Sequence, residues 1–338
     1  MDDRFDRQVR FAPLGRAGQA RIAEARVLLV GCGALGGVLA QCFVRVGVGR
    51  LVLVDRDVVE PTNLPRQVLF DERHAREGTP KAMAAAETLA RVGGPTEVVP
   101  HAAHLDARNL AELAEGAELL LDGTDNLETR YLLNDYALEN DLPWVYAAVV
   151  GGAGLVLPVR PGRGACLRCL FPEPPPPGTL PTCDTSGVIL PAVGVVASMA
   201  AGLGLRLLAA ADDLEPALIE LDAWNGEVRR LSTPRDPECP ACAHGERAWL
   251  FGAPAREPIV LCGRNTVQIP AAGRRRPDLD ALAAGVAGFA RDVLRTSVLL
   301  RFSVDDLRLT VFADGRTLVE GTSDPDRARA ILDRTVGA

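Results

Sequence analysis

The chain has 338 residues and 48% of them are hydrophobic, which is enough for one large domain and a smaller one. Its formal net charge of -7 argues against nucleic acid as the main partner. No apolar run reaches the roughly 18 uninterrupted residues that a membrane helix needs. The charged N-terminus also lacks the apolar segment of a secretory signal. We therefore expect a cytoplasmic protein that binds neither membrane nor nucleic acid.

The chain begins with a βαβ pattern. Residues 25–31 predict a buried strand, a glycine turn and an apolar helix follow, and a second strand ends at Asp55. Gly31 and Gly33 allow the backbone to turn tightly and approach a phosphate, and Gly36 allows helix and strand to pack closely. Asp55 is placed to accept hydrogen bonds from a ribose hydroxyl. Proteins that bind NAD, FAD, SAM or ATP share this pattern, so it predicts a nucleotide without specifying which one.

Strands and helices continue to alternate after this unit, which predicts an α/β fold with a Rossmann-type, doubly wound, mostly parallel sheet. The segment 172–178 contains five prolines and is expected to be an exposed, extended loop. Further strands are expected near 97–101, 118–122 and 144–150, helices over 80–91 and 189–210, and two short strands within 217–233.

Roughly the last 80 residues follow their own pattern of short strands and a final helix. With a boundary near Pro254, we expect a nucleotide-binding domain over residues 1–250 and a small α+β domain over 255–338. Ser323 is expected to cap the final helix, which begins at Pro325. The expected strands of this domain are 298–304, 307–313 and 316–321, with a hairpin turn at Asp314-Gly315.

The chain has eight cysteines, and four of them form two CxxC pairs. In a cytoplasmic protein this spacing indicates metal binding or catalysis rather than disulfides. Two CxxC pairs supply four thiolates for tetrahedral zinc, and a site without an open position is structural. A thioredoxin-like redox pair is the alternative, although its usual sequence context is missing. The expected zinc ligands are Cys166, Cys169, Cys239 and Cys242.

Five short motifs accompany the glycine turn, and together they are far more specific than the turn alone. They are Arg4-Phe5-Asp6-Arg7-Gln8, Asp55-Arg56-Asp57, Asn63-Leu64-Pro65-Arg66-Gln67, Gly78-Thr79-Pro80-Lys81 and Thr124-Asp125-Asn126. This combination resembles the ThiF/MoeB/HesA family, whose fold is shared with ubiquitin-activating enzymes. The resemblance runs over about residues 4–245, nearly three-quarters of the chain.

The resemblance implies an adenylyltransferase. Such an enzyme uses ATP to adenylate the C-terminal glycine carboxylate of a small ubiquitin-like sulfur-carrier protein of the ThiS/MoaD type, and releases pyrophosphate. The activated carrier, which ends in Gly-Gly, then accepts sulfur for thiamine, molybdopterin or thiolated tRNA. The resemblance also implies a homodimer, in which Arg7 reaches into the partner's active site to neutralise phosphate charge. The implied ATP-binding residues are Gly31, Gly33, Gly36, Asp55, Asp57, Asn63, Arg66, Gln67, Lys81, Asp125 and Asn126, with Arg66 and Lys81 on the triphosphate and Asp125 on Mg²⁺.

The chemistry of adenylation independently requires cationic and metal-binding residues of the kinds that the resemblance implies. A carboxylate that attacks the α-phosphate brings two anions together, so the site must be cationic and must carry a metal. Lys81 is the only lysine among 37 basic residues, and a compact point charge suits phosphates; the alternative is an exposed helix lysine placed by chance. A lone carboxylate such as Asp125 suits a Mg²⁺ that keeps most of its waters. The alternative to an ATP-binding role for Asp57 is an ordinary solvated acid in a loop. Arg130 is expected to cap its helix or to pair on it, and not to act in catalysis.

Cys183 follows the proline loop and precedes an apolar helix. The family places a cysteine here in a crossover loop. In thiamine-pathway members it can bond covalently to the activated C-terminus of the carrier, and in molybdopterin-pathway members it is dispensable. A nearby helix N-terminus would lower the pKa of this thiol. A covalent role and a bystander role both stay open, whereas for Cys262 we expect a structural role rather than a sulfur relay.

Two other functions compete with adenylation. An NAD-dependent dehydrogenase would account for the glycine turn and Asp55, but not for Arg66, Lys81 or the CxxC pairs. A non-catalytic scaffold that binds a ubiquitin-like partner is expected to lose some cationic and metal-binding residues, and all of them are present. Within the adenylating class, a peptide-antibiotic-modifying enzyme and a bacterial ubiquitin-conjugation enzyme stay open. Nothing in 255–338 resembles the rhodanese domain of some relatives, so we expect this part to dock the carrier or the dimer partner.

Overall fold

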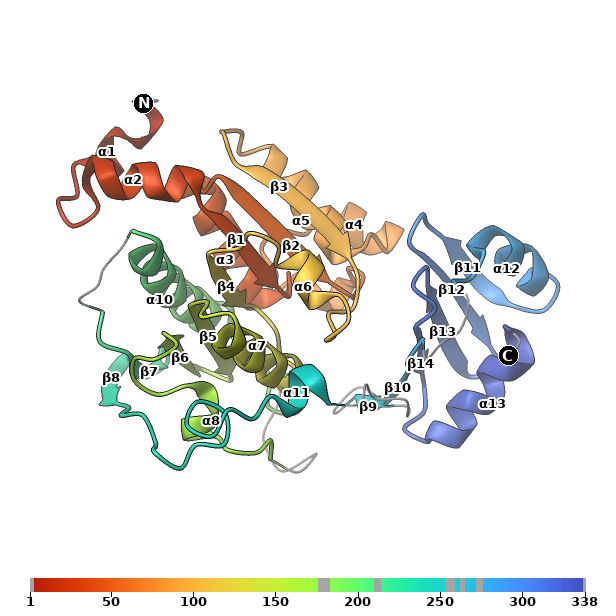
Figure 1. Cartoon of the computed structure of the whole chain (residues 1–338). Helices are drawn as coiled ribbons and strands as arrows, with labels where there is room; N and C mark the ends of the chain where they lie inside the picture. The colour runs from red at the N-terminus through yellow and green to blue at the C-terminus, as the bar shows by residue number, and fades with distance from the viewer. Residues whose placement is uncertain are drawn as a thin grey trace. The chain divides into compact units, whose positions relative to one another are not determined.

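The computed structural model describes residues 3–175, 183–209, 214–252, 259–261, 265–271 and 276–336. They belong to two compact units, a larger one built from 1–175 and 186–252 and a smaller one from 176–185 and 253–338. Each unit has a sheet of its own (Figure 1). The side chain of Cys183 and the whole of Cys262 lie outside the described residues, so the predictions for both stay untested.

The larger unit contains an eight-stranded sheet in the order β3-β2-β1-β4-β5-β6-β7-β8. Strand pairing is parallel from β3 to β5 and antiparallel from β5 to β8. The predicted Rossmann-type arrangement is confirmed for the parallel half. The strands are β1 (Arg26–Val30), β2 (Arg50–Asp55), β3 (Glu97–Ala102), β4 (Leu119–Asp122), β5 (Trp144–Val150), β6 (Ala153–Val159), β7 (Ala217–Asp222) and β8 (Glu227–Ser232).

Helices cover both faces of this sheet (Figure 1). One hydrophobic core lies between the sheet and α3, α5 and α10. A second core lies on the opposite face, where α6 and α7 pack together with the cysteine-containing segments. The helices of this unit are α1 (Asp6–Val9), α2 (Gly15–Glu24), α3 (Ala34–Val46), α4 (Glu72–Glu77), α5 (Lys81–Ala90), α6 (Leu110–Leu113), α7 (Leu127–Glu139), α8 (Leu167–Leu170), α10 (Leu190–Leu208) and α11 (Ala248–Phe251), with 3₁₀ turns over Asp3–Phe5 and Pro61–Asn63. The short helix α9 (Cys183–Ser186) spans the division between the units, since 183–185 are grouped with the smaller one.

Helix α10 is the one described helix that is long and apolar enough to cross a membrane by length and composition. Its mean hydropathy is 1.6 over an 18-residue window, yet residues along one side of it, including Val193, Val196 and Ala200, are buried in the core against the sheet. Burial of this kind identifies it as a core helix of the larger unit.

The smaller unit is an antiparallel sheet in the order β11-β12-β13-β14-β10-β9, and its core includes residues of two helices. The predicted hairpin turn at Asp314-Gly315 joins β13 to β14. The prediction that Ser323 caps the last helix is wrong. Asp324 occupies the N-cap, and its Oδ1 accepts hydrogen bonds from the next two backbone N–H groups along the helix, because the cap must stand immediately before the first helical residue. The elements are β9 (Ile259–Leu261), β10 (Thr266–Ile269), α12 (Leu279–Val286), β11 (Arg291–Arg295), β12 (Leu299–Val304), β13 (Leu307–Phe312), β14 (Thr317–Glu320) and α13 (Pro325–Thr335).

Candidate active site and cysteine cluster

Three glycines bring strands β1 and β4 against the start of α3. A Cβ on Gly36 would lie 1.8 Å from the carbonyl oxygen of Gly31, and a Cβ on Gly123 would lie 2.8 Å from Cα of Gly36. Gly31 also has a left-handed backbone with φ of 87°. Only glycine permits these contacts, so the turn closes tightly at the carboxyl edge of the sheet. Gly123 was missed in the sequence, although a glycine directly after a strand at this edge was a usable signal.

The turn leaves the N-terminus of α3 open. Gly33 is the N-cap residue, and no side chain caps this helix. An uncapped N-terminus presents backbone N–H groups and the positive end of the helix dipole, which together bind phosphate. Gln67 lies beside it, with Nε2 3.6 Å from where a Cβ on Gly33 would stand.

Gln67 is 5% exposed, and its Oε1 has no hydrogen-bond partner among the described residues. A buried amide oxygen without a donor costs about 1–3 kcal/mol, so a ligand that donates to it fits this position. The site therefore has both an anion-binding end and an unsatisfied acceptor, as expected for a nucleotide pocket.

Asp55, Asp57 and Lys81 form a charged cluster at the end of β2. Asp55 is buried, and its two oxygens accept hydrogen bonds from the backbone N–H groups of Cys32 at 2.6 Å and Asp57 at 2.7 Å. Lys81 begins α5 and is 5% exposed; its Nζ lies 3.2 Å from Oδ2 of Asp57. Burial raises the pKa of Asp55, and the positive charge of Lys81 offsets part of this increase. Lys81 is therefore buried, in contrast to the alternative of an exposed helix lysine. Asp57 is paired with it, in contrast to the alternative of a solvated loop acid.

The loop between β2 and α4 holds Asn63 and Arg66. Asn63 is buried, and its Oδ1 accepts a hydrogen bond from the N–H of Glu60 at 3.0 Å. Its carbonyl accepts from the backbone N–H groups of Arg66 and Gln67. Arg66 is half-buried and donates from Nη1 to the carbonyl of Thr62 at 2.6 Å. Asn63 therefore shapes the loop that presents Arg66 and Gln67.

Asp125 follows β4 and its side chain is exposed. Asn126 is the N-cap of α7, where its Oδ1 accepts from the N–H of Thr129 at 3.4 Å. Arg130 pairs with Asp122 at 2.9 Å, at the end of β4 and not on its own helix as expected. The fully buried Asp122 was missed, because the sequence gives no sign that an acid at the end of a strand will be enclosed.

Arg7 lies on α1 with an exposed side chain. Among the described residues no hydrogen bond or ion pair joins it to the nucleotide-site residues. One chain therefore assembles the glycine turn with Asp55, Asp57, Gln67 and Lys81, but Arg7 stays outside this cluster.

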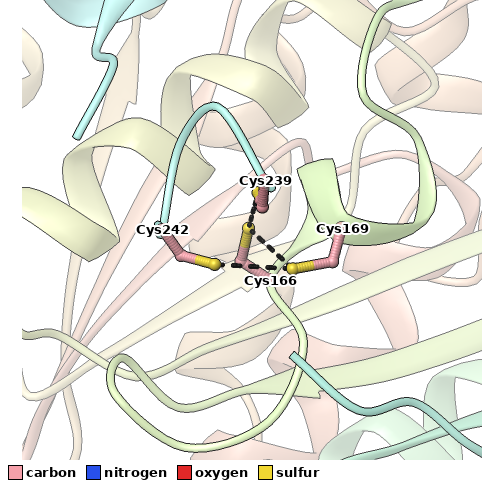
Figure 2. Close-up of side chains that lie close together, drawn as sticks. All are labelled: Cys166, Cys169, Cys239 and Cys242. Atoms are coloured by element: carbon pink, nitrogen blue, oxygen red, sulfur yellow. Dashed lines mark hydrogen bonds between the residues drawn. The ribbon is translucent and has the colours of Figure 1, made fainter. Parts of the chain in front are cut away.

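The four predicted zinc ligands come together in one cluster (Figure 2). Their sulfur atoms all lie within 4.8 Å of one another. The Sγ atoms are 3.6 Å apart for Cys166 and Cys239, 3.8 Å for Cys166 and Cys169, and 3.4 Å for Cys169 and Cys242. His244 instead pairs with Glu238 at 3.5 Å.

Burial raises the pKa of the Cys166 thiol, and its three sulfur neighbours raise it further. Burial also raises the pKa of Cys169 to about 11. A cation among the four sulfurs favours their thiolate forms, and four sulfurs in a compact group match the tetrahedral preference of zinc. The donor set thus fits zinc and leaves no position for a substrate.

A parallel half-sheet with a phosphate-binding turn, a buried lysine at its carboxyl edge and a separate four-thiol cluster together define a nucleotide-binding α/β protein. The comparison with protein families makes this more specific. The chain belongs to the ThiF family, whose family model matches residues 5–241.

Named relatives cover the same region or the whole chain. The sulfur carrier protein ThiS adenylyltransferase of Bacillus subtilis is 38% identical over 340 residues, covering 100% of both chains. The sulfur carrier protein adenylyltransferase of Thermus thermophilus is 39% identical and covers 71% of this chain and 90% of that protein. Among solved structures, E. coli MccB with ATP is similar with a TM-score of 0.61 at 21% identity, covering 72% of this chain and 75% of that one. At this identity the structural match supports the fold alone.

Proposed function

We propose that this protein binds MgATP and adenylates the C-terminal glycine carboxylate of a small ubiquitin-like sulfur-carrier protein. The similarity to the ThiS adenylyltransferase along its whole length supports this reaction. The observation that carries it in the structure is Lys81, the only lysine of the chain, buried beside Asp57 at the end of β2. A dehydrogenase has no need of such a fixed cation at this position.

In the proposed reaction a carboxylate oxygen of the carrier bonds to the α-phosphorus, and the bond from that phosphorus to its bridging oxygen breaks. Negative charge accumulates on the departing pyrophosphate. Lys81 and Arg66 offset this charge, and the N–H groups at the start of α3 hold a phosphate. Asp55 accepts a hydrogen bond from the ribose. Mg²⁺ held by Asp125 would supply further charge neutralisation at the phosphates.

The edge of the larger sheet favours a protein substrate. All six residues of β8 are exposed, and Trp224, in the turn before it, is 78% exposed. An open strand edge with a large apolar side chain suits recognition of a folded partner. Replacing Trp224 by alanine should raise the KM for the carrier about 10-fold and leave the KM for ATP unchanged, since interface aromatics often contribute 1–2 kcal/mol or more.

We also propose a homodimer with Arg7 acting across the interface. The outer side of α10 exposes apolar Leu190 and Val195, which a second copy would cover. Mixing Arg7→Ala protein with Asp125→Asn protein tests this. Random reassortment gives about half heterodimers, each with one intact site, so activity should recover to about a quarter of wild type. If Arg7 acts within its own chain, mixing restores nothing.

The cysteine cluster is proposed to hold one structural Zn²⁺, and the free state of the described cysteines fits the cytoplasm. A covalent bond between Cys183 and the carrier stays a prediction. The test of the main proposal is carrier-dependent ATP–pyrophosphate exchange with carriers that end in Gly-Gly. Exchange with one carrier supports the reaction and identifies its partner. Absence of exchange with every carrier, together with ATP binding, would favour the scaffold or the peptide-modifying alternative.

A further inference from the structure

A buried ion pair adjoins the turn that carries Asp125. Asp122, the last residue of β4, is fully buried, and its Oδ2 accepts a hydrogen bond from Nε of Arg130 at 2.9 Å. Its Oδ1 accepts two more, from the N–H of Thr124 at 2.8 Å and from the Thr124 hydroxyl at 2.7 Å. The carboxylate thus holds the first residue of the turn at two points.

Arg130 is 7% exposed and directs its second nitrogen at the same turn. Its Nη2 donates to the carbonyl of Thr124 at 2.6 Å and to the carbonyl of Ala147, in β5, at 3.0 Å. The guanidinium also lies 5.1 Å from the ring centre of Tyr146. Thr124 is therefore fixed at its N–H, its hydroxyl and its carbonyl, while Asn126, on the other side of Asp125, caps α7.

A buried ion pair is a costly way to hold a strand end, because apolar residues of similar volume are often equally stabilising or better. Here two of the three side-chain hydrogen bonds of Asp122, and one of the bonds of Arg130, end on Thr124, and the third bond of Asp122 joins it to Arg130 itself. We propose that Asp122 and Arg130 are positioning residues for the metal: they fix the turn so that the exposed Asp125 carboxylate is held ready for the Mg²⁺ of MgATP. This inference rests on the proposed role of Asp125.

The test measures metal binding directly. Mn²⁺ is titrated into protein saturated with α,β-methylene-ATP, and free Mn²⁺ is followed by electron paramagnetic resonance. Arg130→Lys keeps the charge but loses the planar fork, and Thr124→Val removes only the hydroxyl donor. Arg168→Lys is the matched control, because Arg168 is 2% exposed, pairs with Glu173 at 3.2 Å and belongs to the cysteine-containing segment.

Arg130→Lys should weaken Mn²⁺ binding about 10-fold or more, as loss of outer partners of a metal ligand does. Thr124→Val should weaken Mn²⁺ binding by a smaller factor. It should also remain folded, even if the Arg130→Lys variant fails to fold. Pyrophosphate exchange by both should approach wild type at saturating metal. Arg168→Lys should leave Mn²⁺ binding unchanged. Unaltered Mn²⁺ binding in both turn variants, or an equal loss in Arg168→Lys, would overturn the positioning role. Asp125→Asn separates the two claims: if it too leaves Mn²⁺ binding unchanged, the metal assignment itself fails.

Discussion

The contact between Gly36 and Gly31 provides a sharp test of the glycine turn. An alanine at position 36 would place its Cβ 1.8 Å from the Gly31 carbonyl oxygen and 2.7 Å from the carbonyl carbon. Both obstructing atoms belong to the backbone, so no side-chain rotation relieves the clash. An ordinary contact needs a displacement of about 1.6 Å between helix and turn, which a close-packed interior resists.

We therefore expect Gly36→Ala to lower the free energy of unfolding by about 3 kcal/mol, the upper end of the usual range for overpacking. A unit of this size loses about 2–4 °C of Tm per kcal/mol, so Tm should fall by about 6–12 °C. ATP affinity should fall as well, because the displaced backbone lines the phosphate position. Thermal unfolding by circular dichroism and ATP titration calorimetry measure the two effects.

Gly37→Ala is the matched control in the next position of the same helix. A Cβ there would meet Leu69 at 3.5 Å and Val68 at 3.7 Å, both ordinary contacts with side chains. Alanine is a better helix former than glycine by about 1 kcal/mol, so this variant should be as stable as wild type or slightly more so. If Gly36→Ala melts within 2 °C of wild type and binds ATP normally, the close approach that defines the turn is not required, and our account of it is wrong.

Three further predictions concern other parts of the larger unit. Lys81→Met should reduce pyrophosphate exchange about 100-fold or more, because losing one group that stabilises the transition state has an effect of this size. Tm should change little. Near-normal exchange would show that Lys81 does not act on the triphosphate. Cys166→Ser should lower the zinc content measured by mass spectrometry from one ion per chain and destabilise the larger unit, because structural zinc contributes folding energy; full zinc content would contradict the ligand assignment. Burial raises the pKa of Asp135, so its contribution to stability is present below pH 3.8 and is lost as pH rises through the higher pKa of the folded state. Asp135→Asn should therefore gain stability over wild type on going from pH 4 to pH 7 in urea unfolding, and an unchanged difference across that range would refute the burial effect.

The residues that could be predicted from the sequence are those whose role is indicated by a pattern of a few neighbouring residues. The glycine turn between β1 and α3 and the CxxC spacing each carry their signal within a few positions. Lys81 stood out for a different reason, since an arginine-rich chain retains a single lysine. The cluster of four cysteines then formed as the spacing predicted.

The residues that were missed depend on neighbours far away in the chain. Gly123 is required because β4 lies next to β1, so that its backbone meets Gly31 and Gly36. Asp122 is enclosed because α7 returns Arg130 to the end of β4. The antiparallel pairing of β6 with β5 and β7 was not recognised either, because β5 and β6 are largely buried, as parallel strands would be. Pairing direction is set by connections across the sheet, and short strand patterns do not encode it.

Helix α7 connects the two regions of the larger unit on which the proposed function depends. Its first turn follows Asp125 and contributes Arg130, which donates a hydrogen bond to the carbonyl of Thr124 in the turn that carries Asp125. Farther along the helix, Oδ1 of Asn134 accepts a hydrogen bond from the N–H of Leu167 at 2.9 Å, directly beside Cys166. The second core packs side chains of α7, including Tyr131 and Leu133, against Cys166 and Cys239. The cysteine cluster therefore packs against the same helix whose first turn contributes Arg130. This gives a structural reason for the proposed zinc site in an enzyme whose proposed chemistry lies at the other end of that helix.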